Sequence, residues 1–175
     1  MELCAELLKE HSRRQMLQVA GYVGDDPERF GELMRLFLSD EYRVVQRAAW
    51  VVSTVAERHP TLIRPYLPRL VKALEDDTAH PSVHRNVMRL LQWAPIPKRY
   101  EGRLYDICIG KIDDPTAPTA VRAFAIEVAA RIANGEPVLL AEIKLVTERH
   151  LKDAKPAIRS KARNVLKIAA TREED

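Results

Sequence analysis

The chain has 175 residues, of which 46% are hydrophobic and 30% are charged, and this composition is typical of a folded globular protein. Its 28 Lys and Arg residues against 25 Asp and Glu residues leave a net charge of +3, too small to demand a polyanionic partner. No uncharged apolar run reaches the roughly 18 residues of a membrane span, and Glu2 and Glu6 interrupt the apolar N-terminus, which argues against a signal peptide. Cys4 and Cys108 are too few for a zinc site and are typical of reduced packing residues. These features predict a cytoplasmic protein.

Apolar residues recur with helical spacing along the whole chain, and proline marks where helices begin. Proline suits the first helical turn because its missing N–H would have no intrahelical partner there. Alternation of polar and apolar residues does not extend beyond a few residues, so no strand is expected. The predicted helices are, in chain order, 2–10, 12–23, 27–39, 43–58, 60–75, 81–93, 97–112, 118–133, 137–152 and 156–171. Pro65 and Pro68 fall inside the fifth of these and predict a late start or a kink.

The sequence repeats with a period close to 38 residues. Four segments align without gaps from Val45, Val83, Val121 and Ile158, at spacings of 38, 38 and 37 residues, and a weaker copy begins at Ser12. Within each copy apolar residues recur at i, i+4, i+7 and i+11, which is the buried stripe of an amphipathic helix. Each repeat is therefore a pair of helices. The aligned segments are the second helices, near 12–23, 43–58, 81–93, 118–133 and 156–171.

Four of the five pairs share a pattern: a Leu-rich first helix, Asp at the turn, and a second helix with Val or Ile followed by Arg near its start. In Val45-Gln46-Arg47 and Val83-His84-Arg85 the Arg comes one position later. Val121-Arg122 and Ile158-Arg159 show it most closely, and over about residues 12–170 the pattern resembles HEAT-type helical repeats. Residues 41–50, 62–68 and 159–167 are also similar to short bacterial HEAT-like (armadillo-type) repeat proteins. The resemblance implies an all-α fold, an α–α superhelix (HEAT-like solenoid) of about five antiparallel helix pairs in a single domain over residues 1–175. It implies a stacked Asp–Arg ladder at the two closest motifs, and it implies no particular activity.

The sequence contains no strong catalytic or metal-binding motif. Among the five histidines, His80 and His84 stand at i, i+4 without a nearby third ligand, so no metal is expected. Gly-rich phosphate loops and Gly-x-Ser-x-Gly turns are absent, so no cofactor or serine nucleophile is expected. Some similar proteins carry the name adenylosuccinate lyase, but the Met-Pro-x-Lys-x-Asn run of that enzyme is missing here. The recurring acidic pairs predict turn and capping roles: Asp25-Asp26, Asp76-Asp77 and Asp113-Asp114.

The second helices are expected to line an inner surface of the array. Their outward positions combine arginines with larger apolar residues, and Trp, Met and Arg are enriched at binding hot spots. We therefore predict a monomeric, non-enzymatic binding or scaffold module that recognises a protein partner on this surface. The residues predicted at its centre are Arg47, Trp50, Arg85, Met88 and Arg89. An alternative interpretation is that the large apolar residues of this row pack between neighbouring repeats, namely Trp50, Met88 and Ile126.

Nucleic-acid binding is the alternative function. Six basic residues and no acidic one lie between Lys155 and Arg172, a pattern that fits either a nucleic-acid contact or a solvated outer cap. Some HEAT-like bacterial proteins are DNA glycosylases that hold alkylated duplex against a basic inner face, near a Trp and a carboxylate. Here the nearest outward carboxylate on the second helices is Glu127, two repeats away from Trp50.

Overall fold

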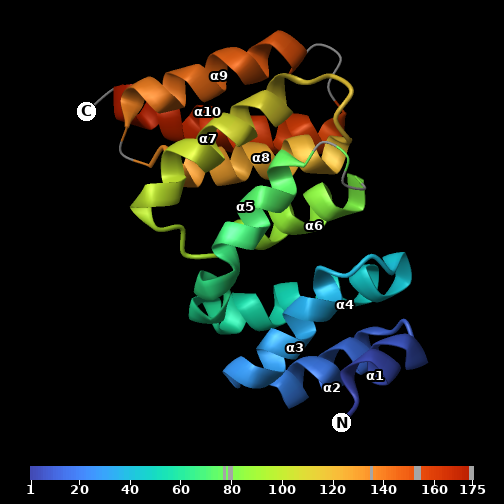
Figure 1. Cartoon of the computed structure of the whole chain (residues 1–175). Helices are drawn as coiled ribbons and strands as arrows, with labels where there is room; N and C mark the ends of the chain where they lie inside the picture. Colours follow the sequence, from blue (N-terminus) through green and yellow to red (C-terminus); the bar gives the residue numbers. More distant parts are fainter. Residues whose placement is uncertain (77, 79–80, 135, 152–154, 174–175) are drawn as a thin grey trace. The chain divides into compact units, whose positions relative to one another are not determined.

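The computed structural model describes residues 1–76, 78, 81–134, 136–151 and 155–173 (Figure 1). Within these ranges the backbone forms helices joined by short connections, and no strand. The predicted all-α fold class is confirmed, and every predicted helix begins and ends within two residues of an observed boundary. Asp77 and His80 lie outside the described residues.

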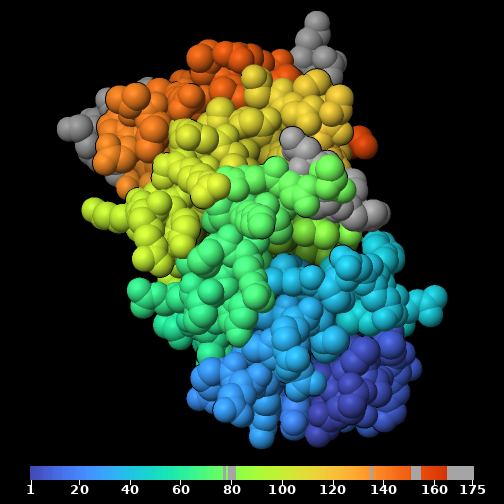
Figure 2. Space-filling model, viewed as in Figure 1, coloured from blue at the N-terminus to red at the C-terminus, as the bar shows by residue number. Residues whose placement is uncertain are grey.

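The helices gather into two compact units. Unit 1 comprises Met1–Leu70 and Trp93–Pro95, and unit 2 comprises Val71–Gln92 and Ile96–Asp175. Side chains fill the spaces between the ribbons within each unit (Figure 2). A single domain over the whole chain stays a prediction.

Unit 1 contains two complete helix pairs, and each first helix packs against the second helix of its own pair. The second helices also pack on each other, as the repeat predicts. The first pair is α1 (Leu3–Lys9) with α2 (Arg13–Val23), and the second is α3 (Pro27–Phe37) with α4 (Tyr42–Arg58). A 3₁₀ segment, η1 (Pro60–Tyr66), follows, and α5 (Leu67–Glu75) runs from unit 1 into unit 2.

Unit 2 contains α6 and the last two helix pairs. Its second helices α6, α8 and α10 form a row, because α8 packs against both α6 and α10. The bounds are α6 (Pro81–Leu91), α7 (Lys98–Asp113), α8 (Thr119–Ile132), α9 (Pro137–Leu151) and α10 (Pro156–Glu173). In Figure 1 these helices run from light green through yellow to red.

Local sequence explains where the helices begin. The side chains of Glu2, Ser12 and Asp26 accept hydrogen bonds from backbone N–H groups in the first turns of α1, α2 and α3. Gly24 ends α2 with a φ of 53°, a left-handed conformation that glycine adopts without steric cost. The proline-rich stretch forms a 3₁₀ segment before the regular α-helix at Leu67, so the late start predicted from Pro65 and Pro68 is confirmed.

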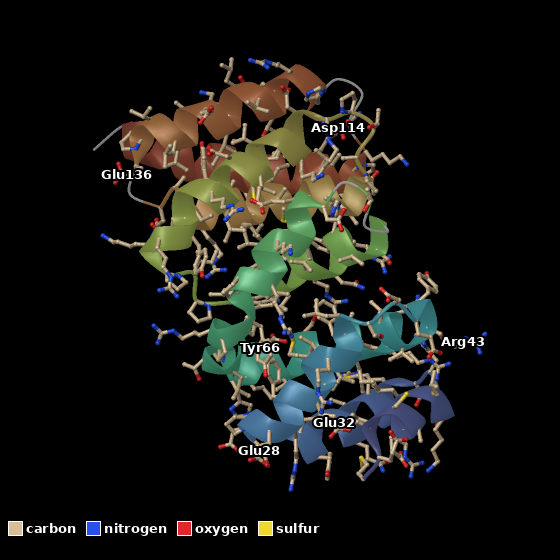
Figure 3. The ribbon with its side chains drawn as sticks, in the orientation of Figure 1. Glu28, Glu32, Arg43, Tyr66, Asp114 and Glu136 are labelled. Carbon is tan, nitrogen blue, oxygen red and sulfur yellow. The ribbon has the colours of Figure 1, made fainter. Side chains whose placement is uncertain are left out.

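The apolar stripe forms the core of unit 1. In α4 its four members Val45, Ala49, Val52 and Ala56 are buried. Opposite them, Phe30 of α3 is fully buried and meets the Tyr66 ring edge-on, with ring centroids 5.8 Å apart (Figure 3 labels Tyr66). Gly31 accommodates this approach, because a Cβ there would lie 2.9 Å from the Tyr66 hydroxyl oxygen and the Tyr66 side chain would have to shift.

The same stripe is buried in unit 2, with differences at the helix ends. In α8, Val121, Ala125 and Val128 are buried, and in α10 the same holds for Ile158 and Ala162. Two members of the stripe are partly exposed: Val83, in the first turn of α6, and Ile132, the last residue of α8. The side chains of Val165 and Ala169 lie outside the described residues. The predicted register is therefore confirmed where the structure describes it.

Candidate binding surface on the second helices

The predicted binding residues lie on two second helices that belong to different units. Arg47 and Trp50 are on α4 in unit 1, whereas Arg85, Met88 and Arg89 are on α6 in unit 2. Each group is therefore a separate patch, and a single site that joins them stays a prediction.

Arg47 and Trp50 line a shallow hollow between the α1–α2 turn and α4. Its walls also contain Leu7, Glu10, His11, Ser12, Gln15, Met16, Val19 and Val51. The space inside is about 20 Å³, close to the volume that admits one water molecule. Small-molecule sites are more than ten times larger, at about 300–1,000 Å³. The hollow is therefore too small to enclose an ordinary substrate.

Trp50 is partly exposed at the edge of this hollow. The His11 ring lies 5.7 Å from the Trp50 ring, centroid to centroid, at an interplanar angle of 39°. The backbone carbonyl of Trp50 accepts a hydrogen bond of 3.0 Å from the Thr54 hydroxyl, so the following turn of α4 is also tied to it. The indole therefore offers apolar surface at the helix face while one side is supported by His11.

Arg47 joins α4 to the end of α1. Its Nη1 donates a hydrogen bond of 2.9 Å to the backbone carbonyl of Leu7. Carbonyl groups in the last turn of a helix have no intrahelical partner, and a cation stabilises that end of the helix. Arg47 is therefore at least in part a structural residue, with the remaining N–H groups of its partly exposed guanidinium on the hollow's wall.

Arg85 and Arg89 are the exposed arginines of α6. They stand one helical turn apart on the same face. Neither guanidinium has a hydrogen-bond or ion-pair partner among the described residues, and both side chains are exposed. Of the five predicted residues, these two are the most available to a partner.

Met88 is a correction to the predicted surface. Its side chain is fully buried, and its sulfur lies 4.0 Å from the sulfur of Cys108 on α7. Burial raises the pKa of the Cys108 thiol to about 12, which keeps this thiol protonated in an apolar environment. Ile126, at the equivalent position of α8, is also fully buried. Packing is therefore the right interpretation for Met88 and Ile126, and the prediction of Met88 as a surface residue is wrong.

Two further arginines of the second helices bind backbone carbonyls. Arg122 is buried, and its Nε and Nη2 donate to the carbonyl of Ile112 at 3.1 and 2.9 Å, at the end of α7. Arg131 Nη1 donates to the Leu91 carbonyl at 2.5 Å, at the end of α6, and burial lowers the pKa of Arg131. The bonds of Arg122 therefore go to a helix end, and not to an Asp of a stacked ladder.

Acidic residues at the joints hold turns and pair with neighbours. The Asp76 and Asp114 carboxylates each accept hydrogen bonds from the backbone N–H and hydroxyl of the threonine two residues later. Hydrogen bonds from Thr116 lower the pKa of Asp114. Together with the cap formed by Asp26, these contacts confirm turn and capping roles at three of the predicted positions.

Asp113 and Glu127 take part in ion pairs. Asp113 contacts His150 Nε2 at 3.0 Å and Arg149 Nη1 at 3.4 Å, and its pKa is lowered, first by the His150 hydrogen bond and then by the charge of Arg149. Glu127 is the carboxylate that the glycosylase alternative would need near Trp50, and it forms an ion pair with Lys161 of α10. Its charge is therefore neutralised by a neighbouring helix.

The residues that complete the hollow were not among those predicted from the repeat pattern. His11 and Ser12 lie in the turn before α2, and Gln15 is buried in the first turn of α2. The side-chain amide of Gln15 donates to the Glu6 backbone carbonyl at 2.9 Å and to the Glu6 carboxylate at 2.7 Å. Ser12 carried a detectable signal as a helix cap. The approach of this turn to α4 depends on tertiary packing, for which the repeat pattern gave no signal.

Comparison with known proteins identifies the family of the repeats. A family model described as a HEAT repeat domain matches residues 3–169. The chain belongs to the HEAT repeat domain family. No curated protein and no solved structure matches it in the corresponding comparisons. The matched range begins with α1 and covers α10 up to residue 169, so the second helices α2, α4, α6, α8 and α10 are those of HEAT repeats.

Among the described residues, none of the helices is both long enough and apolar enough to span a membrane.

Proposed function

We propose that this HEAT repeat protein is a cytoplasmic, non-enzymatic binding module that recognises a protein partner through its second helices. HEAT repeats are helical scaffolds that commonly mediate protein interactions, and such repeat proteins bind their partners on extended surfaces formed by successive repeats. The observation that carries the proposal is the pair Arg85 and Arg89, which are exposed and without a partner among the described residues, on a helix whose other face is buried in the core.

The hollow at Trp50 and Arg47 supports the same proposal in unit 1. A partly exposed Trp beside a small apolar recess is a typical anchor for a partner's side chain. Exposed residues on the same helix include Arg43, which extends into solvent from α4 (Figure 3). The proposed contact residues are therefore Arg47, Trp50, Arg85 and Arg89, without the buried Met88.

The test is capture of partners from the native cytoplasm by the tagged protein, followed by mass spectrometry. The double variant Arg85→Ala/Arg89→Ala is expected to lose the captured partner and to keep the free energy of unfolding within about 1 kcal/mol, because both side chains are exposed. The matched control is Lys72→Ala/Lys98→Ala, which removes two cations from the first helices α5 and α7. A partner retained equally by both double variants would contradict the assignment of α6. A partner that depends on Lys72 and Lys98 would place binding on the first helices.

A further inference from the structure

The HEAT repeats segregate their charges by position in the repeat. The five second helices contain fourteen Lys and Arg residues and three Asp and Glu residues. The remaining helical segments contain twelve Lys and Arg residues and nine Asp and Glu residues. The rest of the sequence contains two and thirteen, respectively. Although the net charge is only +3, the charge is unevenly distributed: the second helices are basic and the turns that precede them are acidic.

In α2, α4, α6 and α8 every Lys or Arg position is an arginine. Arginine binds a carboxylate with two parallel hydrogen bonds, whereas lysine acts as a point charge. Arg47, Arg122 and Arg131 use N–H groups to bind helix ends within their own unit. Arg85 and Arg89 have no such partner among the described residues, which leaves both groups available for an external carboxylate.

Little negative charge opposes them on the second helices of unit 2. Among the described side chains of α6, α8 and α10, Glu127 is the one carboxylate, and Lys161 neutralises it. Arg163 is exposed on α10, the other second helix that packs against α8. The row α6–α8–α10 therefore presents arginines with no uncompensated acid among those side chains.

We propose that α6 binds a short acidic segment of the protein partner, with Arg85 and Arg89 each binding one carboxylate. This rests on the proposed function and specifies the chemistry of the partner. Residues four apart on a helix rise about 6 Å along its axis. Alternate residues of an extended chain are separated by about 6.6 Å. An extended segment with Asp or Glu at every second position therefore matches the spacing of the two arginines when it lies along α6.

The acidic turns favour a short segment over a nucleic-acid duplex. A helix of 11 residues such as α6 is about 16 Å long, so its ends lie about 8 Å from its middle. This is about one Debye length at physiological salt, so charges at the two ends are partly screened at the middle of the helix. Asp76 lies in the turn before α6, and Asp114 lies in the turn before α8. A duplex carries one charge per about 1.7 Å of axis and extends past these turns, where it meets repulsion. Two or three carboxylates can bind between the turns.

The experiment is an NMR titration of the ¹⁵N-labelled full chain with a peptide of about ten residues that has Glu at alternate positions. We expect backbone amide shifts to concentrate in α6, and the affinity to fall about tenfold or more in Arg85→Glu/Arg89→Glu, because two attractive contacts become repulsive. The control Lys72→Glu/Lys98→Glu changes the net charge by the same amount and is expected to change the affinity less than about threefold. The uncharged variant Arg85→Gln/Arg89→Gln, also expected to weaken binding, keeps the test valid if the reversed variant does not fold.

Three results would overturn the inference. Equal weakening by the reversed variant and its control would indicate non-specific attraction to the whole chain. Tighter binding of a short DNA duplex, with a steeper salt dependence, would assign the arginines to phosphate. Absence of any shift with the peptide would exclude this acidic segment as the ligand. In the last case the capture experiment still decides whether α6 binds a partner, so the proposed function is tested separately.

Discussion

Arg122 is the second-helix arginine whose removal should destabilise unit 2 most. It is 8% exposed, and its Nε and Nη2 donate at 3.1 and 2.9 Å to one acceptor, the Ile112 carbonyl at the end of α7. No carboxylate among the described residues pairs with it. Arg122→Met keeps an apolar side chain of similar length and removes both donors, so it isolates the hydrogen bonds from the packing of the stem.

The expected loss is about 2–3 kcal/mol. A hydrogen bond that involves a charged group contributes about 1.5–3 kcal/mol, and two donors that share one carbonyl do not contribute twice that amount. The carbonyl left behind adds part of its desolvation penalty, because the last turn of α7 offers it no intrahelical donor. Arg122→Lys can restore one of the two bonds and should lose about half as much.

The assay is urea unfolding at neutral pH followed by far-ultraviolet circular dichroism. With a denaturant dependence of about 2 kcal/mol per molar urea, the midpoint of Arg122→Met should fall by about 1 M or slightly more. The matched control is Arg163→Met on the exposed face of α10, which should stay within about 0.5 kcal/mol of the parent. A midpoint for Arg122→Met indistinguishable from that of Arg163→Met would refute the structural role of the Arg122–Ile112 contact.

Three further predictions concern the core, pH dependence and thiol reactivity of unit 2. Val87→Asp places a carboxylate at a fully buried position of α6, which costs several kcal/mol. The melting temperature should therefore lie well below that of the parent protein. An unchanged melting temperature would show that the predicted helix register is wrong. The pKa of Asp113 is lowered in the folded protein by His150 and Arg149, so its stabilising contribution is present above about pH 4 and is lost as pH falls through the folded pKa. Asp113→Asn should therefore flatten the acid side of a stability profile measured from about pH 2 to 6, and a profile parallel to the parent would contradict this. Burial raises the pKa of the Cys108 thiol to about 12, so this thiol should not react with a thiol reagent at about pH 8 until the chain is unfolded. Rapid labelling of both cysteines in the native protein would argue against the packing around Met88.

The helices and their pairing could be predicted from the sequence because they depend on local information. Apolar residues at i, i+4, i+7 and i+11 form one face of a helix whatever that face packs against. Proline and capping residues act within a few positions of themselves, so Asp26 and Pro27 fix the start of α3 without any distant contact. A period near 38 residues then predicts that the same order of first and second helix recurs in each pair. Even the irregular start of the fifth helix followed from the position of its prolines.

The binding residues could be predicted only in part, because exposure depends on what covers each helix. Arg85 and Arg89 are exposed as predicted from their direction on α6. Met88 is adjacent to Arg89 in the chain, yet α7 covers it through Cys108, twenty positions away. The Arg47–Leu7 and Arg131–Leu91 bonds each join residues forty positions apart. Sequence periodicity determined which side chains point away from the core stripe of their own helix. Tertiary packing decided which of them are covered by a neighbouring helix, and which arginines bind helix ends instead of remaining available to a partner.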